Sequence, residues 1–496
     1  MSEGTPTTRS FLPRPISCLG SGRFRFLNQE RTVYPEDFGK RKDGLLWDYN
    51  FHYFDGLLAP LPDYDAKARW VEQWLAHVPV GSRPAWDPYP VSRRVCNWIK
   101  WSLSSGSHEL PGLLPSLASQ VRHLERTLEY HLMANHLLAN AVAITMAGAF
   151  FAGREGDGWL ARGSALLEQQ LDEQFLPDGA HFELSPIYHS VILEDLLDLM
   201  IVARRLGVGL PSVVESRVRS AADWLAHMIR PDGRVPLLND AAYDQGPRAA
   251  EVLAQTERML GPAPAPGDGL HYLEGSGYFR YRSGRLFVLG DVGQIGPSYQ
   301  PGHAHCDMLS FELCWEDRPL IVDTGTSTYE ISPRRSAERG TAAHNTVQLN
   351  GLEQTEIWAG FRVARRARVE DVVAEAGKIS AQIRAFPAAW SRLHRDWRFS
   401  RGESMQIEDR ILSNPAGLPA TTRLHFHPDV KLAGRGDLWS AEGLQIRVEG
   451  ALAVRNVEYL YAPEFNTLRT ARCLEIDFDD HLLTQIHPIR SSHTKL

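Results

Sequence analysis

The spacing of apolar residues along the chain changes once, near residue 265. From about residue 65 to 262, apolar residues recur every three or four positions, as in KARWVEQWLAHV and EDLLDLMIVARRL, which is typical of amphipathic helices. The same spacing continues over many turns through LPSLASQVRHLERTLEYHLMANHLLANAVAITMAGAFF. A series of helices of similar length predicts antiparallel hairpins, arranged as a bundle or as a helical toroid.

After the Pro/Gly-rich linker at 261–269, the period becomes two. Apolar and polar residues alternate in GYFRYRSGRLFVLGD, MLSFELCWEDRPLIVD, WRFSRGESMQIEDRIL and TRLHFHPDV, which is typical of an antiparallel β-sandwich. The sequence therefore predicts a multidomain α + β protein. We expect an N-terminal segment (residues 1–64) that packs on the helical part, a helical domain (65–262) and a β-sandwich domain (270–496).

Composition and missing motifs exclude several classes of function. The 496 residues carry a formal net charge of −7, whereas a nucleic-acid-binding protein needs a basic surface to neutralise phosphates. The five cysteines are scattered and form no CxxC pair, so neither a disulfide framework nor a thiolate zinc site is indicated. The chain contains no GxSxG, P-loop, HExxH or GxGxxG motif, which argues against serine hydrolysis, phosphoryl transfer and hydride transfer.

The N-terminal residues MSEGTPTTRSFLPRP contain no apolar run long enough for the core of a signal peptide. No stretch of about 18 apolar residues predicts a membrane span. We therefore expect a soluble cytoplasmic protein from the chain as written, or a periplasmic or secreted one if a leader has been removed. The sequence carries no signal for the oligomeric state.

The first candidate for chemistry is the pair Asn135-His136 in an otherwise apolar helical stretch, with Asn140 five residues further on. Polar side chains in such a stretch need partners if they are buried. The alternatives at this point are a catalytic pair, or a structural amide beside a core histidine.

The second candidate is DGAHFELSPIYHS, which gathers Asp178, His181, Glu183, Tyr188 and His189 before an apolar helix. Ser185-Pro186 resembles the start of a helix, with Pro at the first helical position. A tyrosine and several titratable groups at a helix start suit proton transfer. An ordinary capping region with a packed aromatic ring would explain the same residues.

The third candidate, PGHAHCDMLSFEL, places His303, His305 and Asp307 at alternate positions. If a strand begins here, these three residues share one face. Asp323 and His344 follow downstream, and two histidines with a carboxylate from neighbouring strands form a plausible metal site. A hydrogen-bonded polar cluster is the alternative.

Three further segments are rich in arginine, and two of them also carry aromatic rings; together they contain the candidate substrate-binding residues Trp86, Tyr89, Arg93, Arg339, Trp358 and Arg362. Aromatic faces stack on sugar rings, and the guanidinium group binds carboxylate or sulfate through two parallel hydrogen bonds. Solvated surface arginines are the alternative.

Taken in order, these segments resemble the heparinase II/III family of polysaccharide lyases. The stretches that match are NHLLANAVAITMAGAFF, DGAHFELSPIYH, PGHAHCDMLSFEL, IVDTGTSTY and RGTAAHNTV, and LLWDYNFHYFDGL and WDPYPVSRRVCNWIKW are similar to N-terminal segments of the same group. The resemblance covers about residues 25 to 430. It implies an incomplete (α/α) toroid followed by an antiparallel β-sandwich, which agrees with the helical first part and the β-type second part that the two periods predict.

The resemblance also implies roles for single residues. Asn135 would neutralise the substrate carboxylate, His136 and Tyr188 would act in proton transfer, and His303 would be the histidine supplied by the β domain. His305, Asp323 and His344 would hold a divalent metal (zinc or manganese) with a structural role. Glu183 and Asn140 are further candidates for substrate contact. Many relatives carry a Glu three residues after the histidine, but this chain has Ala139 there.

From the resemblance we expect β-elimination on an anionic, uronic-acid-containing polysaccharide of the glycosaminoglycan type, with a 4,5-unsaturated sugar in the product. We expect no nucleic-acid or membrane partner. Three alternatives stay open: a uronyl C5 epimerase, which shares the first step; a non-catalytic polysaccharide-binding or assembly protein; and a glycoside hydrolase using carboxylates such as Asp178, Glu183 and Asp240.

Overall fold

The computed structural model describes residues 11–40, 44–105, 109–385, 391–400 and 402–489. Contacts between residues divide the chain into two compact units. The first, which we call the helical unit, comprises Met1–Phe175, Tyr188–Ala222 and Glu251–Ala263. The second, the β unit, comprises Leu176–Ile187, Asp223–Ala250 and Pro264–Leu496. The sequence predicted three separate parts (residues 1–64, 65–262 and 270–496), and that division stays a prediction.

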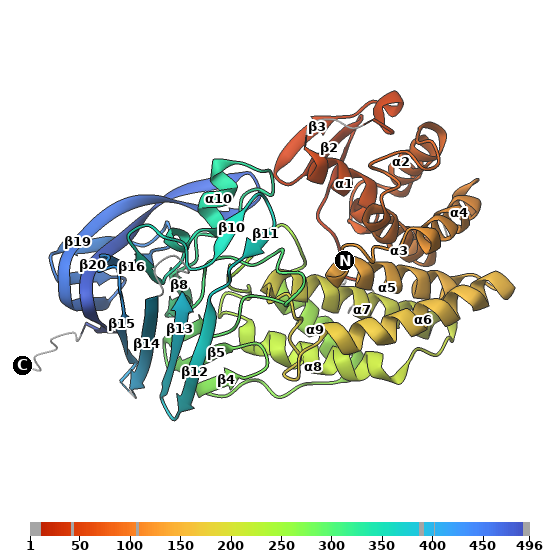
Figure 1. Cartoon of the computed structure of the whole chain (residues 1–496). Coiled ribbons are helices and arrows are strands. Elements are labelled where there is room, and N and C mark those ends of the chain that lie inside the picture. Colours follow the sequence, from red (N-terminus) through yellow and green to blue (C-terminus); the bar gives the residue numbers. More distant parts are fainter. Residues whose placement is uncertain (1–10, 41–43, 106–108, 386–390, 401, 490–496) are drawn as a thin grey trace, which may run out of the picture. The chain divides into compact units, whose positions relative to one another are not determined.

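The N-terminal part of the helical unit begins with a small antiparallel sheet of three strands, followed by helices (Figure 1). Its elements are β1 (Cys18–Gly20), β2 (Arg23–Phe26), β3 (Gln29–Thr32), η1 (Pro35–Asp37), α1 (Leu45–Tyr53), η2 (Asp55–Leu58), α2 (Tyr64–His77), α3 (Pro88–Ser105), α4 (Leu113–Arg126), α5 (Ala134–Phe150) and α6 (Arg154–Gln174). Helices α7 (Pro186–Leu206), α8 (Ser212–Met228) and α9 (Ala249–Leu260) follow, each with most of its residues in the helical unit.

Local sequence explains where several of these helices begin. The carboxylate of Asp63 accepts a hydrogen bond from the backbone N–H of Ala66 and so caps α2. Pro186 is the first residue of α7, as Ser185-Pro186 predicted. Helix α5 is buried along almost its whole length because its residues are apolar on every side, and it packs against α3 and α6.

The β unit contains two antiparallel sheets. The strands of the five-stranded sheet are β4 (Gly269–Leu273), β5 (Tyr278–Ser283), β6 (Leu286–Asp291), β7 (Phe311–Trp315) and β8 (Arg318–Ile321), paired in that order. The ten-stranded sheet contains β9 (Val347–Leu349), β12 (Arg368–Glu375), β13 (Lys378–Ala385), β14 (Ser391–Ser400), β15 (Ser404–Ser413), β16 (Ala420–His425), β17 (Leu432–Arg435), β18 (Leu438–Ala441), β19 (Leu444–Glu464) and β20 (Thr467–Pro488).

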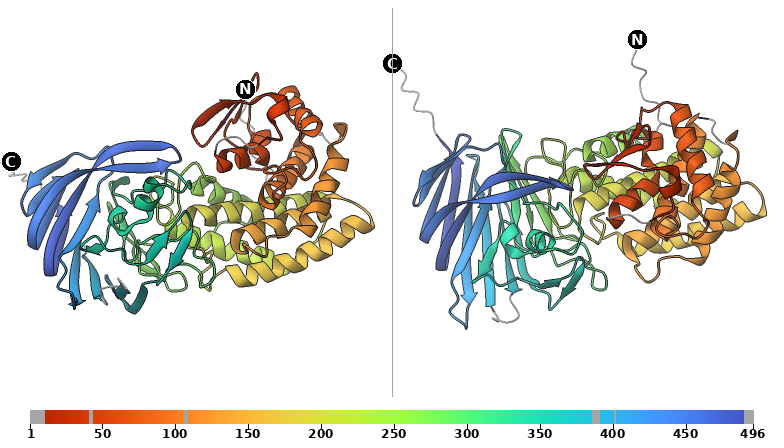
Figure 2. Two further views of the ribbon diagram at one scale, coloured as in Figure 1. Left: turned by 45° about the horizontal axis from the view of Figure 1, so that its top comes forward. Right: turned by 90° about the horizontal axis from the view of Figure 1, so that it is seen from above.

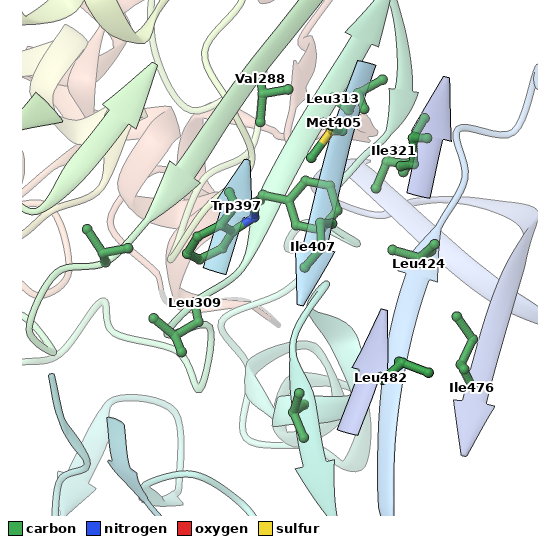
Figure 3. Packing of buried hydrophobic residues seen from close by; sticks show 14 of the residues in the cluster. Val288, Leu309, Leu313, Ile321, Trp397, Met405, Ile407, Leu424, Ile476 and Leu482 are labelled. Carbon is green, nitrogen blue, oxygen red and sulfur yellow. The ribbon is translucent and has the colours of Figure 1, made fainter. Parts of the chain in front are cut away.

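Side chains from both sheets form one apolar core (Figure 3). Val288 and Leu313 come from the five-stranded sheet, and Trp397, Ile407 and Leu424 from the ten-stranded one. Across the core, the rings of Tyr281 and Phe399 stack with centroids 4.0 Å apart. Burial of alternate residues on facing sheets is the arrangement of a β-sandwich. The strands predicted from the period of two are confirmed.

Strands β19 and β20 form a long, strongly curved pair, drawn in blue in Figure 2. Their register shifts between Glu449 and Ala451 and again between Ala451 and Ala453, and bulges of this kind bend a strand. Gly450 lies at the first shift with φ +88°, where a Cβ atom would come within 2.6 Å of the carbonyl oxygen of His481. Glycine is therefore required where the pair bends.

The β unit also contains a short hairpin, β10 (Glu356–Trp358) and β11 (Arg362–Ala364), the short helix α10 (Pro333–Arg339) and the 3₁₀ turn η4 (Thr341–Ala343). Within the described ranges, no helix combines the length and the apolar character that crossing a bilayer requires. The order of elements, helices first and antiparallel strands second, confirms the predicted fold class.

Candidate active site

A pocket in the helical unit brings together residues from α3, α5 and α7. Its walls are formed by Tyr89, Asn135, Leu138, Ala139, Val142, Tyr188, Val191, Ile192 and Asp195. Two of the predicted catalytic residues, Asn135 and Tyr188, therefore line one pocket, together with Tyr89, which was predicted to bind substrate. Apolar walls with a few polar groups are the usual composition of a small-molecule site.

An irregular turn precedes the polar start of α5. The spacing of apolar residues predicts helix through this region, but α4 ends at Arg126 and α5 begins at Ala134. Met133 and Ala134 both have positive φ values, 57° and 51°, which residues other than glycine rarely adopt. The carbonyl oxygen of Glu129 accepts hydrogen bonds from the N–H groups of Leu132 and Met133. Because the turn ends at residue 133, Asn135 lies in the first helical turn.

The side chain of Glu129 connects this turn to α5. Its Oε1 atom lies 3.0 Å from Nδ1 of His136, and its Oε2 atom accepts a hydrogen bond of 3.0 Å from Nδ2 of Asn140. The amide of Asn140 also accepts from the backbone N–H of Glu129 and donates to Oγ of Ser92 on α3. The ring of His136 lies against that of Tyr89, with centroids 4.7 Å apart. Glu129 therefore fixes two of the residues that the sequence singled out.

Buried ion pairs connect α3 and α7 next to the pocket. Arg93, on α3, contacts the pocket-lining carboxylate of Asp195 at 2.6 Å and lies 3.6 Å from Asp55. The neighbouring pairs are Arg14–Glu194 and Lys100–Asp198, at 2.8 and 2.7 Å. Burial raises the pKa of Glu194 to about 7, although Arg14 acts in the opposite direction. Burial also raises the pKa of Tyr89, so its hydroxyl is a neutral phenol at physiological pH.

In the β unit, the segment with His303, His305 and Asp307 is not the start of a strand, so the prediction that these residues share one strand face is wrong. Strand β7 begins only at Phe311, and Leu309 has a positive φ of 60°. The backbone of this loop bonds to other loops instead: Asp240 N–H donates to His303 O, and Cys306 N–H donates to Arg339 O. The alternation of polar residues here reflects these loop contacts and not a pleat.

Both histidines nevertheless converge on one carboxylate, that of Asp240. Nδ1 of His303 lies 3.0 Å from Oδ2 of Asp240, and Nε2 of His305 lies 2.9 Å from Oδ1. The guanidinium of Arg335 binds both oxygens of the same carboxylate. Although burial acts in the opposite direction, the charge of Arg335 and the two imidazoles hold the pKa of Asp240 well below its usual range. Asp240 is therefore a fixed anion that orients His303, whose Nε2 atom lies 3.4 Å from Glu183.

Aromatic rings surround His303 within the β unit. Its ring centroid lies 6.1 Å from that of Phe361 and 6.3 Å from that of Tyr329. Arg335 lies over both of these rings, at 5.3 and 4.9 Å, and donates to the carbonyl oxygen of Gly360 in the β10–β11 hairpin. Trp358 on the same hairpin is 49% exposed. The predicted binding residue Trp358 is thus about half exposed, three residues before Phe361, whose ring lies beside that of His303.

The other predicted binding residues differ in their surroundings. Trp86 is buried and stacks against Trp74, and Arg339 is buried and donates to the carbonyl oxygen of Ala304. Asn140 is also fully buried, with its amide used inside the protein. Arg362 is exposed. Direct substrate contact by any of these residues stays a prediction, and the buried ones have structural partners.

The sequence model described as the heparinase II/III N-terminus matches residues 66–260, and the model described as heparinase II/III-like, C-terminal, matches residues 265–492. The chain belongs to the heparinase II/III family.

The curated proteins that are similar to this chain carry two kinds of name, heparin-sulfate lyase and FtsZ-localized protein C. A heparin-sulfate lyase of Bacteroides stercoris is 27% identical over 304 residues, which are 55% of this chain and 45% of the relative. A heparin-sulfate lyase of Pedobacter heparinus is 25% identical, covering 57% and 48%. The chain thus spans about half the length of these lyases. FtsZ-localized protein C of Caulobacter vibrioides is 26% identical over 418 residues, covering 77% of this chain and 69% of that protein.

Solved heparinase structures share the fold. A crystal structure of heparinase III matches with a TM-score of 0.71 and 17% sequence identity, covering 87% of this chain and 74% of that one. The heparan sulfate lyase HepC of Pedobacter heparinus matches with a TM-score of 0.63, covering 95% and 82%. The predicted heparinase-like fold of a helical region followed by an antiparallel β domain is confirmed.

The family resemblance predicts a divalent metal on His305, Asp323 and His344, and the arrangement of these residues fits it in part. Nδ1 of His305 and Nε2 of His344 are buried without a hydrogen-bond partner among the described residues, and the two ring centroids lie 5.4 Å apart. However, Asp323 binds Nδ1 of His344 at 2.7 Å, and no set of three or more donor side chains converges in the described part of the chain. The two imidazole nitrogens suit a metal, but the third predicted ligand, Asp323, binds His344 instead. The metal site stays a prediction.

Sequence reasoning missed Glu129, and it missed that the carboxylate of Asp240 binds both His303 and Arg335. Glu129 lies in a turn that no Gly or Pro marks, and Asp240, in a loop, is far in sequence from Arg335, which lies on α10. The only signal was that polar groups in apolar segments need partners. The expectation that Asn135, His136, Tyr188 and His303 form one reaction centre stays a prediction.

Proposed function

We propose that this protein is a polysaccharide lyase that cleaves uronic-acid-containing, glycosaminoglycan-like polysaccharides by β-elimination. The observation that carries the proposal is that Asn135, Tyr188 and Tyr89 line one pocket in a chain of the heparinase II/III family. The names of the curated heparin-sulfate lyases support the substrate class.

The reaction needs a way to make the C5 proton of the uronic acid acidic. The adjacent carboxylate opposes this while it is charged, and a hydrogen-bond donor on the carboxylate stabilises the enolate-like intermediate. In the proposal, the amide of Asn135 donates that bond. His136 or Tyr188 then takes the C5 proton as the base, the electron pair of the C5–H bond forms the C4–C5 double bond, and the C4–O4 bond breaks with its electrons on O4. In the proposal, the hydroxyl of Tyr188 gives the proton to O4, because a phenol can both donate and accept.

His303 belongs to the β unit, so its predicted role in the reaction is proposed separately from those of Asn135 and Tyr188. Asp240 accepts from its Nδ1 atom, so in the neutral imidazole the lone pair lies on Nε2. A divalent ion bound through His305 and His344 would fix these loops, and no step of the elimination passes through it. His303→Ala should lower activity without lowering the unfolding midpoint by more than a few degrees, which a thermal melt beside the assay would check.

The direct test is ultraviolet absorbance of the unsaturated product during incubation with heparan sulfate, hyaluronan, alginate and bacterial uronans. We expect product with at least one of these, and a loss of about 100-fold or more in kcat for Tyr188→Phe, the scale of a lost proton-transfer group. Tyr130→Phe is the matched control because Tyr130 is 59% exposed and does not line the pocket. Absence of product from every polymer would refute the lyase proposal.

Two of the alternatives are outcomes of the same assay. Incorporation of solvent deuterium at C5 without chain cleavage would establish a uronyl C5 epimerase. A glycoside hydrolase has less support, because Arg335 binds the carboxylate of Asp240, and the carboxylate of Asp178 accepts from the N–H and hydroxyl of Ser276. Hydrolysis needs two carboxylates free to act on the glycosidic bond.

A second candidate function is suggested by the similarity to FtsZ-localized protein C, which covers more of this chain than the similarity to the curated lyases does. Under this alternative, the protein is a non-catalytic binding or assembly protein that associates with FtsZ. Co-sedimentation with purified FtsZ filaments, unchanged by Tyr188→Phe and without any unsaturated product, would favour it over the lyase.

A further inference from the structure

The carboxylate of Glu129 is buried beside His136 and has no role in the reaction as proposed above. Its side chain is 5% exposed, yet both oxygens are engaged: Oε1 with Nδ1 of His136 and Oε2 with the amide of Asn140. Asn140 in turn is bound to Ser92, so the carboxylate is anchored to α3 as well as to α5. This many contacts fix the position of Glu129 and, through it, that of the imidazole.

The contact with Glu129 determines which nitrogen of His136 carries hydrogen. An ionised carboxylate can only accept hydrogen bonds, so Nδ1 must donate. In the neutral ring the lone pair then lies on Nε2, the form that can accept a proton. The side chain of His136 is 33% exposed, and it lies beside Asn135 in sequence and against the ring of Tyr89, both of which line the pocket.

The charge of Glu129 has few other partners. Among the described residues its ion pair is with His136, and Asn140 is neutral. A buried anion stabilises a cation that forms beside it. When Nε2 takes up a proton, the imidazolium therefore gains a counter-charge that is already in place and needs no rearrangement of the protein.

We propose that Glu129 is a positioning residue for the elimination: it holds His136 with Nδ1 protonated and stabilises the imidazolium that forms when Nε2 removes the C5 proton. This inference rests on the proposed lyase function. It divides the reaction between two residues of the helical unit. His136 takes the proton from C5, Tyr188 gives its phenolic proton to O4, and transfer of the proton from Nε2 back to the phenolate through solvent restores both residues.

The decisive variant is Glu129→Gln, which keeps a hydrogen-bond acceptor for Nδ1 and removes the charge. We expect kcat to fall about 10- to 100-fold, the scale for groups that orient a functional histidine, with KM nearly unchanged. The acidic limb of the pH profile of kcat/KM should move to lower pH, because the imidazolium loses its counter-charge. Glu129→Asp, which restores the charge on a shorter side chain, should recover part of the rate.

Glu125→Gln is the matched control. Glu125 lies four residues earlier, and its carboxylate accepts from Nε1 of Trp159 and pairs with Arg162, so it has a purely structural environment. Its variant should keep the wild-type pH profile. If Glu129→Gln lost activity only in proportion to lost folded protein, with an unchanged pH profile, the inference would be overturned.

A second measurement does not depend on activity. The ¹⁵N chemical shifts of the His136 ring in the wild-type protein should identify the tautomer with hydrogen on Nδ1, and Glu129→Ala should abolish that preference. Observation of the Nε2–H tautomer in the wild type would overturn the inference even in an active lyase. Absence of product from the wild type would refute the proposed function, and this inference with it.

Discussion

Each unit holds a histidine through its Nδ1 atom on a buried carboxylate, but the two carboxylates differ in how their charge is balanced. In the β unit, Asp240 is paired with Arg335 and is shared by two histidines. In the helical unit, Glu129 is shared by His136 and a neutral amide. An anion already balanced by arginine does not need a protonated histidine, whereas an anion without such a partner favours one. Asp240 therefore suits fixing a ring in place, and Glu129 suits an exchange of protons.

Asp240→Asn should have the largest effect on this comparison, and the effect is on the free energy of unfolding. The substitution leaves the guanidinium of Arg335, which is fully buried, without its counter-charge. Breaking one partner of such a pair typically costs about 3–5 kcal/mol. We expect a decrease of this size in the free energy of unfolding, measured by urea denaturation. Glu129→Gln should cost only about 1 kcal/mol, because it keeps a hydrogen-bonding side chain and strands no arginine.

The double variant Asp240→Asn/Arg335→Met is the control for this difference, because it removes the charge that the single variant leaves unpaired. It should regain much of the stability lost in Asp240→Asn. Equal losses from Asp240→Asn and Glu129→Gln would show that the two carboxylates are not balanced differently, and the comparison would fail.

A smaller effect on stability is expected from Glu194, a buried carboxyl group of the helical unit next to the pocket-lining residue Asp195. Burial raises the pKa of Glu194 to about 7 from an ordinary 4.5, so the folded protein holds a proton there that the unfolded chain releases. The charged groups that interact with it are Arg14, Arg93, Lys100, Asp195 and Asp198. Between about pH 4.5 and 7 the folded state binds more protons, so this residue's contribution to stability is present at the acidic end and is lost as the pH rises.

The loss should be on the order of 2 kcal/mol across that range. Urea denaturation at a series of pH values would measure it. Glu194→Gln should flatten the dependence, while Glu155→Gln, at an exposed pair with Arg122, should leave it as in the wild type. A steeper pH dependence in Glu194→Gln than in the wild type would contradict the assignment.

The sequence predicted the parts of the molecule that repeat, and it missed those that depend on contacts between distant residues. The two apolar periods predicted the helices and strands, and Pro186 predicted the start of α7, because each of these depends on neighbours within a few residues. The turn before Asn135 was missed because it replaces helical hydrogen bonds with contacts of Glu129. The partnership of His303 with Asp240 joins residues 63 positions apart in sequence, and no periodic pattern encodes it.

The smallest expected effect concerns the two tryptophans predicted to bind sugar, one in each unit. Trp86 is buried against Trp74, whereas Trp358 is 49% exposed on the β10–β11 hairpin. Arg335 binds this hairpin through the carbonyl oxygen of Gly360, and it also binds Asp240. If the exposed ring stacks on a sugar, Trp358→Ala removes about 0.5–1.5 kcal/mol of binding, which raises KM about 2- to 13-fold and leaves kcat unchanged.

Trp86→Phe separates binding from packing in the same assay. It should lower the unfolding midpoint and leave KM unchanged, because a buried ring cannot reach a polymer in solution. Arg365→Ala is the control on the hairpin itself, since Arg365 forms an exposed ion pair with Glu356 and lies close to Trp358 in sequence. Equal increases in KM from Arg365→Ala and Trp358→Ala would assign the effect to the positive charge or the fold of the hairpin, and not to the aromatic face.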